Sequence, residues 1–326
     1  MTPRRLLASI ALVVLAVAPA TAGERSTTEN FVVDAPTKEL AKAFGEYAEK
    51  YRQEKALDWL GYEMPRWPQR CPLKVKITLG QAGGATTFTF GSDGTKRSTV
   101  LSQEMSIFGE IKQLLNSVLP HEITHTVLAH HFGQAVPRWA DEGGSVLSEN
   151  DEERFTHDVR CREILNQGRG FPLKHLFQMK EYPKDMIVVY AQGYSVCQYL
   201  IDNGGRQKFL QFVGKGMKND NKNWEEAIKM YGYSSTDELQ EAWIAALHKP
   251  PARVAARNND SRPSGALTAS RGPETRSSAV AGLVMLEPPV VARGVAPEER
   301  RASPATKAAS PPPVLPKLLP PEPPKR

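Results

Sequence analysis

The chain is poor in cysteine, with three among its 326 residues. So few cysteines exclude a disulfide-rich scaffold, and their spacing does not match a cysteine-based zinc site. In an oxidising compartment they allow one disulfide and one spare thiol. Cys197 lies in an apolar helical stretch, where we expect a buried small hydrophobic residue, so Cys71 with Cys161 is the favoured pair. The connectivity itself stays open at this point.

Aromatic residues are absent from 249–326, a segment rich in proline, alanine, serine and arginine. Such a segment buries too little apolar surface to offset the entropy cost of ordering, so we predict a disordered tail. Its excess of basic over acidic residues exceeds the net charge of +6 of the whole chain, so the part before it is slightly acidic. The overall charge therefore does not indicate specific nucleic-acid binding. The tail is either a solvated segment or a weak contact for an anionic envelope surface.

Long apolar runs are absent after residue 22. Residues 1–22 hold two arginines, an apolar run shorter than the roughly 20 residues of a spanning helix, and the small-x-small ending Ala-Thr-Ala. This pattern predicts a secretory signal peptide, with an uncleaved membrane anchor as the alternative. We therefore expect an exported protein, periplasmic or extracellular, whose folded domain is 23–248.

The periodicity of this domain changes along the chain. Apolar residues recur every three or four positions over 37–59, which predicts an amphipathic helix. Alternating or β-branched residues then predict strands at 73–79, 85–90 and 97–103. The remainder has helical patterns, at 110–132, 138–150, 152–166, 186–202, 205–215, 222–231 and 235–247. We therefore expect an α+β fold, with a small, mainly antiparallel sheet followed by helices.

The motif with the clearest chemistry is His121-Glu122-x-x-His125. Positions i and i+4 of a helix share one face, so both imidazoles can reach one zinc ion, and Glu122 then projects beside the metal. A carboxylate placed there can take a proton from zinc-bound water and pass it to a leaving amine. The motif therefore predicts a catalytic zinc site with Glu122 as the base.

A third ligand is expected from the helix that follows Pro137. A catalytic zinc ion takes three protein ligands and keeps one position open, and two histidines with a glutamate are a recurring set. The short connection after His125 would bring Glu142 beside the first two ligands. We predict one zinc ion per chain, held by His121, His125 and Glu142. A solvated helix carboxylate is the alternative for Glu142.

These motifs resemble the gluzincin branch of the peptidase MA clan, which includes thermolysin and the zinc aminopeptidases. More narrowly, the chain is similar to bacterial extracytoplasmic peptidase MA-like proteins. Those proteins have an HExxH helix, a Pro-x-Trp-x-x-Glu-Gly segment and a later Tyr-Ala-Gln helix, which here correspond to 121–125, 137–143 and 190–195. The resemblance covers about 31–248 and implies a zincin-like fold.

The resemblance also implies an oxyanion donor on the later helix, for which Tyr190 is the first choice and Tyr194, one turn on, the second. Both could instead be ordinary aromatics of an amphipathic helix. The chain departs from the family at Val146, where thermolysin-like enzymes have an aspartate that orients a zinc histidine. Asp141 and Glu149 are the candidates to replace it.

The other histidines form no set with ligand spacing, and a structural role is expected for each: His130, His131, His157, His175 and His248. We therefore predict that the protein hydrolyses peptide bonds with the help of zinc, and that its site resembles that of an endopeptidase. Residues 97–103 are expected to form an edge strand that aligns a peptide or protein substrate. One alternative is a non-catalytic zinc-binding envelope protein that serves as an interaction module. Another is a hydrolase of a different amide or ester on the same scaffold.

Overall fold

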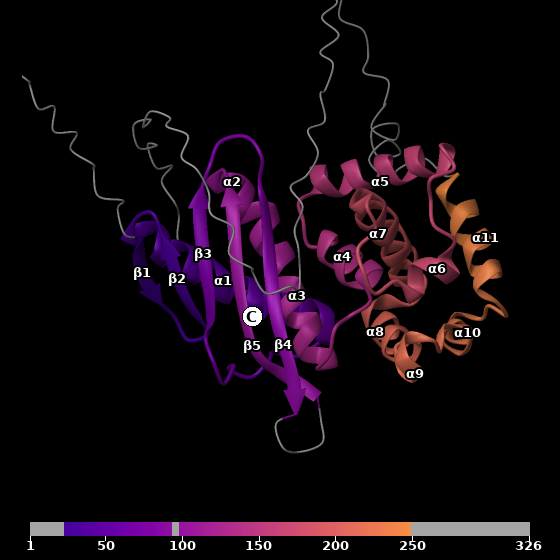
Figure 1. Ribbon diagram of the computed structural model, residues 1–326, viewed down its shortest axis with the longest axis horizontal. Helices are drawn as coiled ribbons and strands as arrows, with labels where there is room; N and C mark the ends of the chain where they lie inside the picture. The colour runs from indigo at the N-terminus through magenta and orange to yellow at the C-terminus, as the bar shows by residue number, and fades with distance from the viewer. Residues whose placement is uncertain (1–22, 93–97, 249–326) are drawn as a thin grey trace, which may run out of the picture.

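The computed structural model of the protein describes residues 23–92 and 98–248. The predicted signal peptide, 1–22, and the predicted tail, 249–326, lie outside these ranges. Figure 1 shows the strands gathered at one end of the molecule and most of the helices at the other. The expected α+β class is confirmed for the described part of the chain.

Five strands form one sheet in the order β1-β2-β3-β5-β4. Their bounds are β1 (Glu24–Thr27), β2 (Phe31–Ala35), β3 (Cys71–Ile77), β4 (Gly83–Ser92) and β5 (Ser98–Gly109). The pairs β2–β3 and β3–β5 are parallel, whereas β1 and β4 pair antiparallel at the two edges. The expectation of a mainly antiparallel sheet is therefore wrong, because the sheet is evenly mixed.

The parallel pairing comes from α1 (Lys38–Leu60), which joins β2 to β3. A helix that crosses over a sheet returns the next strand in the same direction as the one before it. The side chain of Thr37 accepts a hydrogen bond from the Leu40 N–H at the start of α1, and Gly61, with φ 79°, ends it. The sequence pattern predicts this helix almost to the residue but does not predict β2 before it.

The position of β5 also differs from expectation. This strand lies between β3 and β4, so the sheet edge next to the helices belongs to β4. The hypothesis that 97–103 form a substrate-aligning edge is therefore corrected, and β4 takes that place.

The helical part follows β5 without a break. Its elements are α2 (Ile111–Gln113), the π-helical turn η1 (Leu114–Val118), α3 (Leu119–Phe132), α4 (Arg138–Val146), α5 (Asp151–Asn166), α6 (Leu173–Gln178), α7 (Met186–Asp202), α8 (Gly205–Gly216), α9 (Lys218–Asn221), α10 (Trp224–Ala227), the 3-10 turn η2 (Ile228–Tyr231) and α11 (Thr236–Leu247). Among the described residues no helix is long and apolar enough to cross a membrane.

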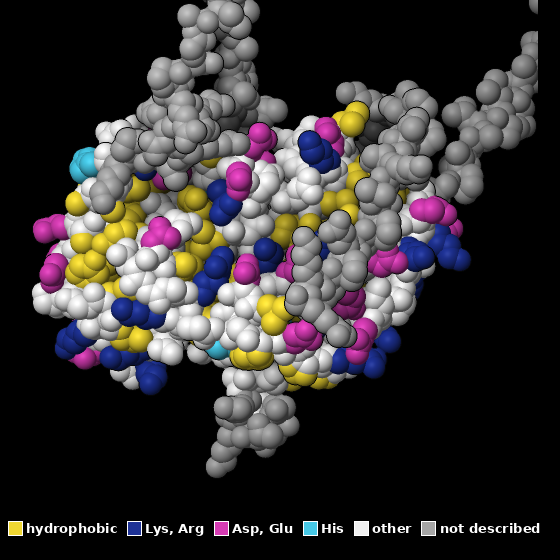
Figure 2. All heavy atoms as spheres, turned by 180° about the vertical axis from the view of Figure 1, so that it is seen from behind, with side chains coloured by type: hydrophobic (Ala, Val, Ile, Leu, Met, Phe, Trp, Pro, Cys, Tyr) yellow, Lys and Arg dark blue, Asp and Glu magenta, His cyan; other side chains and the backbone are white. Residues whose placement is uncertain are grey.

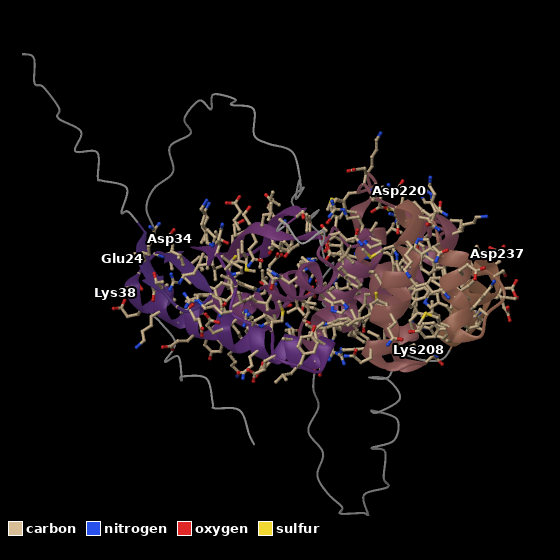
Figure 3. The ribbon with its side chains drawn as sticks, turned by 90° about the horizontal axis from the view of Figure 1, so that it is seen from below. Glu24, Asp34, Lys38, Lys208, Asp220 and Asp237 are labelled. Atoms are coloured by element: carbon tan, nitrogen blue, oxygen red, sulfur yellow. The ribbon has the colours of Figure 1, made fainter. Side chains whose placement is uncertain are left out.

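The buried hydrophobic residues form two cores, one where the sheet packs against α1 and α3 and one mainly among the later helices. Figure 3 shows the sheet part and the helical part next to each other along the long axis of the molecule. Cys71 belongs to the sheet core, whereas Cys161 and Cys197 belong to the helical core, and all three are buried free thiols. The favoured Cys71–Cys161 disulfide is therefore wrong, because the two thiols lie in different cores. The burial expected for Cys197 is confirmed.

Helix α3 connects the two cores. Leu119 and Ile123, in its first half, pack in the sheet core, and Val127 and Leu128, in its second half, pack in the helical core. On the face drawn in Figure 2, Lys and Arg side chains and Asp and Glu side chains are both present among hydrophobic ones, and neither sign covers the whole face. The interior of the molecule, where the two cores meet on α3, holds the buried polar residues described next.

Candidate metal centre

Helix α3 carries the HExxH motif at its buried start. Glu122 and His125 are nearly inaccessible to solvent, and His121 is 8% exposed. The turn before them is π-helical, with the Leu119 N–H bonded to the carbonyl of Leu114. A π turn accommodates Pro120, which has no N–H to donate, and such turns are frequent at functional sites.

Three candidate ligand atoms from α3 and α4 converge. The Nε2 atoms of His121 and His125 lie 3.1 Å apart, and each is 3.5 Å from Oε2 of Glu142, which is fully buried. A tetrahedral zinc ion with bonds of about 2.0–2.1 Å separates its ligands by about 3.4 Å. The donor types and their spacing therefore fit one such ion, with the fourth position left for a non-protein ligand.

Two carboxylates hold the rings of the two histidines. Nδ1 of His121 lies 2.6 Å from Oε1 of Glu149, and Nδ1 of His125 lies 2.6 Å from Oδ1 of Asp141. A bond at Nδ1 fixes the tautomer and leaves Nε2 free to bind a metal. Asp141 and Glu149, the two residues that the sequence suggests as partners of the histidines, both occupy this position.

The charges around the histidines favour a cation. Burial lowers the pKa of His121, but hydrogen bonds with Glu142 and Glu149 outweigh it and raise the pKa to about 10. Burial also raises the pKa of Glu149, which His121 and His157 nevertheless hold at about 2. The carboxylates therefore stabilise positive charge at this place, whether a proton or a metal ion supplies it.

Glu122 lies beside the three ligand atoms and is fixed by the sheet. Its Oε2 accepts a hydrogen bond of 2.5 Å from Thr86 on β4. Gly84, two residues earlier, leaves room for this carboxylate, because a Cβ there would come within 2.7 Å of Glu122 Cγ. Edge strand β4 thus holds the side chain at the place where a base would be needed.

Glu122 and Glu142 are rival candidates for the third ligand. A carboxylate oxygen of Glu122 also lies within 4.8 Å of ligand nitrogens of both histidines. However, Glu142 is 3.5 Å from both Nε2 atoms, whereas Glu122 is bonded to Thr86. The equal distances of Glu142 from the two nitrogens, and the hydrogen bond that Glu122 makes elsewhere, favour Glu142 as a third ligand and Glu122 for proton transfer.

Helix α7 brings Tyr190 to the same place. The backbones of α4 and α7 touch: a Cβ on Gly143 would lie 2.3 Å from the Gly193 carbonyl carbon, and one on Gly193 would lie 2.6 Å from the Trp139 oxygen. The Tyr190 ring, one turn before Gly193, stacks on His121 with 6.3 Å between ring centroids. Tyr194 instead packs in the helical core, and burial raises its pKa to about 12.

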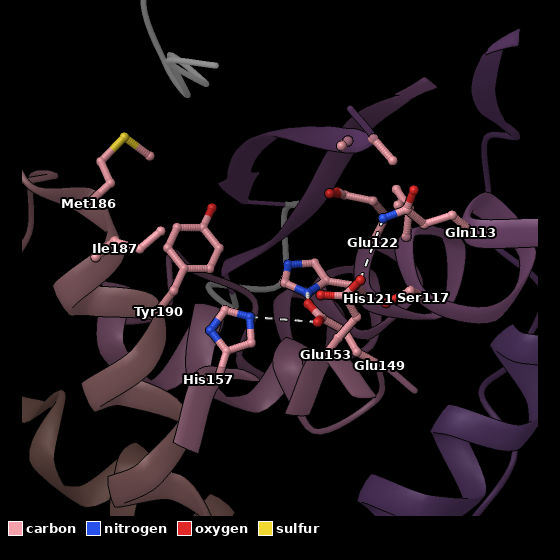
Figure 4. A pocket seen from close by; sticks show the side chains of 14 residues that line it. Gln113, Ser117, His121, Glu122, Glu149, Glu153, His157, Met186, Ile187 and Tyr190 are labelled. Carbon is pink, nitrogen blue, oxygen red and sulfur yellow. Dashed lines mark hydrogen bonds and ion pairs between the residues drawn. The ribbon is translucent and has the colours of Figure 1, made fainter. Parts of the chain in front are cut away.

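A cavity of about 280 Å³ opens between α7, α3, β4 and α5 (Figure 4). Met186, Ile187 and Tyr190 form one wall, Gln113 and Ser117 lie opposite, and His121 lies between them. The remaining lining residues include Gly83, Gly84, Glu122, Glu149, Glu153 and His157. The predicted base, Glu122, and the predicted oxyanion donor, Tyr190, thus line one cavity together with His121.

The sequence does not predict two residues that the structure places at the site. His157 lines the cavity, with Nε2 3.6 Å from Oε2 of Glu149, where the sequence suggests only a structural role. Tyr182, in the segment between α6 and α7, donates a hydrogen bond to Oε1 of Glu142. Neither belongs to a motif, and only the fold brings them to the centre.

Comparisons with protein-family models, with curated proteins and with solved structures found no match to this chain. The interpretation of the site therefore depends on its own residues and their geometry.

Proposed function

We propose that this protein is a zinc-dependent hydrolase of peptide bonds, with a zincin-like arrangement in which an edge strand runs beside an HExxH helix. The observation that carries the proposal is the convergence of two Nε2 atoms and Oε2 of Glu142 at 3.1–3.5 Å, with Glu122 directly beside them. A site of this kind has all the groups that hydrolysis of an amide requires, as set out below.

His121, His125 and Glu142 would hold the metal, with Glu149 and Asp141 fixing the two imidazoles. A bound zinc ion would supply a Lewis acid that polarises a carbonyl and makes water more acidic. Glu122 then takes a proton from the attacking water and delivers it to the leaving nitrogen. The hydrogen bond from Thr86 to Glu122 holds this carboxylate next to β4.

Tyr190 is proposed as the donor to the oxyanion that develops in the transition state. Its ring lies against His121 and lines the cavity, as this role requires. An extended peptide could align on β4, the edge strand that carries Thr86 and Gly84. We further propose that the protein acts outside the cytoplasm, on the basis of the predicted signal peptide.

Hydrolysis of a mixed peptide library by the zinc-loaded protein tests the proposal, with the Glu122→Gln variant and a chelator as controls. The parent should cleave peptides, and both controls should abolish cleavage. If the parent binds zinc but cleaves neither peptides nor other amides and esters, a non-catalytic zinc-binding module replaces the proposal. Cleavage of another amide or ester alone would keep the chemistry and change the substrate.

A further inference from the structure

The two oxygens of Glu142 have different partners. Oε2 faces both histidine ligands at 3.5 Å, whereas Oε1 accepts a hydrogen bond from the hydroxyl of Tyr182. Carboxylates bind metal ions through one oxygen or through both. Oε2 is therefore the oxygen that faces the two histidines, and the Tyr182 phenol competes with a metal for Oε1.

Tyr182 is itself held in place by α4. The Arg138 guanidinium lies 4.4 Å from the centroid of the Tyr182 ring, and its Nη1 is 3.4 Å from the Tyr182 hydroxyl oxygen. Nε of Arg138 also donates to the carbonyl of Lys180 at 3.2 Å. Arg138 and Glu142 are one helical turn apart, so the phenol lies along one face of α4.

This arrangement sets the direction of the hydrogen bond. A guanidinium can only donate, so the Tyr182 oxygen accepts from Arg138 and its own proton goes to Glu142. Cation–π contact with Arg138 limits rotation of the ring as well. The phenol therefore presents a fixed donor to one oxygen of the ligand.

We propose that Tyr182 is a positioning residue that keeps Glu142 a one-oxygen ligand and so preserves the open coordination position that hydrolysis needs. The inference rests on the proposed zinc centre. A second bond from Oε1 would fill the place of the attacking water. Tyr182 is not among the described residues that line the cavity, so it acts through Glu142 rather than on the substrate.

Tyr182→Phe tests the proposal, because it removes one hydroxyl and keeps the ring against Arg138. We expect zinc affinity, measured by competition with a chromophoric chelator, to fall by about 10- to 100-fold, as is typical for loss of a group that orients a ligand. In the cobalt-substituted protein, the parent should show the intense visible bands of four-coordinate Co(II). The variant should show the weaker bands of a higher coordination number.

Tyr233→Phe is the matched control, because its hydroxyl bonds with that of Tyr199 at 2.6 Å, away from the metal centre. This variant should keep both the zinc affinity and the cobalt spectrum of the parent. Arg138→Gln should change the spectrum in the same direction as Tyr182→Phe, since it frees the phenol.

Three outcomes would overturn the proposal. An unchanged affinity and spectrum in Tyr182→Phe, with or without a fall in kcat, would show that the phenol does not position Glu142. An equal change in Tyr233→Phe would show a general loss of structure. A parent that binds no cobalt would refute the metal centre as a whole. In contrast, a parent that binds cobalt but hydrolyses nothing refutes only the proposed function, and the spectra still decide the role of Tyr182.

Discussion

The Nδ1 atom of His125 lies 2.6 Å from Oδ1 of Asp141, the residue directly before Glu142. Adjacent residues of α4 thus face the same two histidines in different ways: Oε2 of Glu142 lies 3.5 Å from both Nε2 atoms, whereas Asp141 is bonded to Nδ1 of His125. Both are buried, which makes the spacing of α3 and α4 critical for the site.

Asp141→Asn should weaken zinc binding by roughly 10- to 100-fold, because the amide removes the negative charge that supports the His125 imidazole. Chelator competition measures the effect. Asp237→Asn, an exposed carboxylate at the far helical end of the molecule (Figure 3), should leave the affinity unchanged. Equal affinity in parent and Asp141→Asn would remove Asp141 from the centre.

Glu142→Gln and Glu122→Gln should separate the ligand from the base. The first removes an anionic oxygen from the metal, so zinc content should fall and activity with it. The second should keep zinc while turnover falls by about a hundredfold or more, because proton transfer is lost. Metal analysis and hydrolysis assays on both variants decide the matter. Loss of zinc in Glu122→Gln alone would reverse the two assignments.

Tyr190→Phe should lower kcat with little change in zinc content, since it removes a hydrogen bond to the transition state and no ligand. Tyr194→Phe should leave kcat close to that of the parent, because Tyr194 packs in the core. Steady-state kinetics on the two variants is the measurement. A fall in kcat confined to Tyr194→Phe would show that the helix presents the other tyrosine to the substrate.

Gly143→Ala should destabilise the protein by about 1 to 3 kcal/mol or more, because the new methyl group would overlap the backbone of α7. Gly214→Ala is the matched control in helix α8, where the new Cβ has only a contact of 3.4 Å with Phe132. That change should be neutral or should stabilise by up to about 1 kcal/mol, as alanine favours helix. Denaturant unfolding of both variants gives the comparison.

His130 should make the protein sensitive to acid. Burial, with the Arg52 guanidinium nearby, lowers the pKa of His130 to about 4, and its ring stacks on Trp67. The unfolded chain binds a proton near pH 6.5 that the folded chain does not bind until about pH 4. Stability from this group is therefore present above pH 6.5 and lost as the pH falls toward 4. His130→Gln should reduce the fall of Tm between pH 6.5 and 4. An unchanged slope in this range would contradict the lowered pKa of His130.

The sequence predicts those parts of the fold that depend on local signals. The period of apolar residues and the cap at Thr37 define α1, and the HExxH spacing places His121, Glu122 and His125 on one helix. It does not predict β1 and β2, which are only four and five residues long. If β2 is not recognised, the sequence does not show that α1 joins two parallel strands, β2 and β3. The strands that it does predict then suggest an antiparallel sheet.

The candidate site shows the same division. Glu142, Asp141 and Glu149 lie in or near a motif, so their residue types point to them. Tyr182 lies in a short polar segment with no period, and His157 is one of several histidines outside any motif. Only the packing of α5 and of the α6–α7 segment against α4 and α7 brings these two to the centre, and a linear pattern does not encode it.

The division of α3 between two cores has a consequence for the order of folding. His121 lies between Leu119 and Ile123, which pack in the sheet core, whereas Glu142 lies on α4, which packs in the helical core, and the partner of Glu122 is Thr86 in the sheet. During refolding, the convergence of His121 with Glu142 and the alignment of Glu122 therefore both need the two cores to dock on α3. Uptake of metal at the proposed centre and recovery of turnover should therefore appear together, and their common rate would time the docking of the two halves.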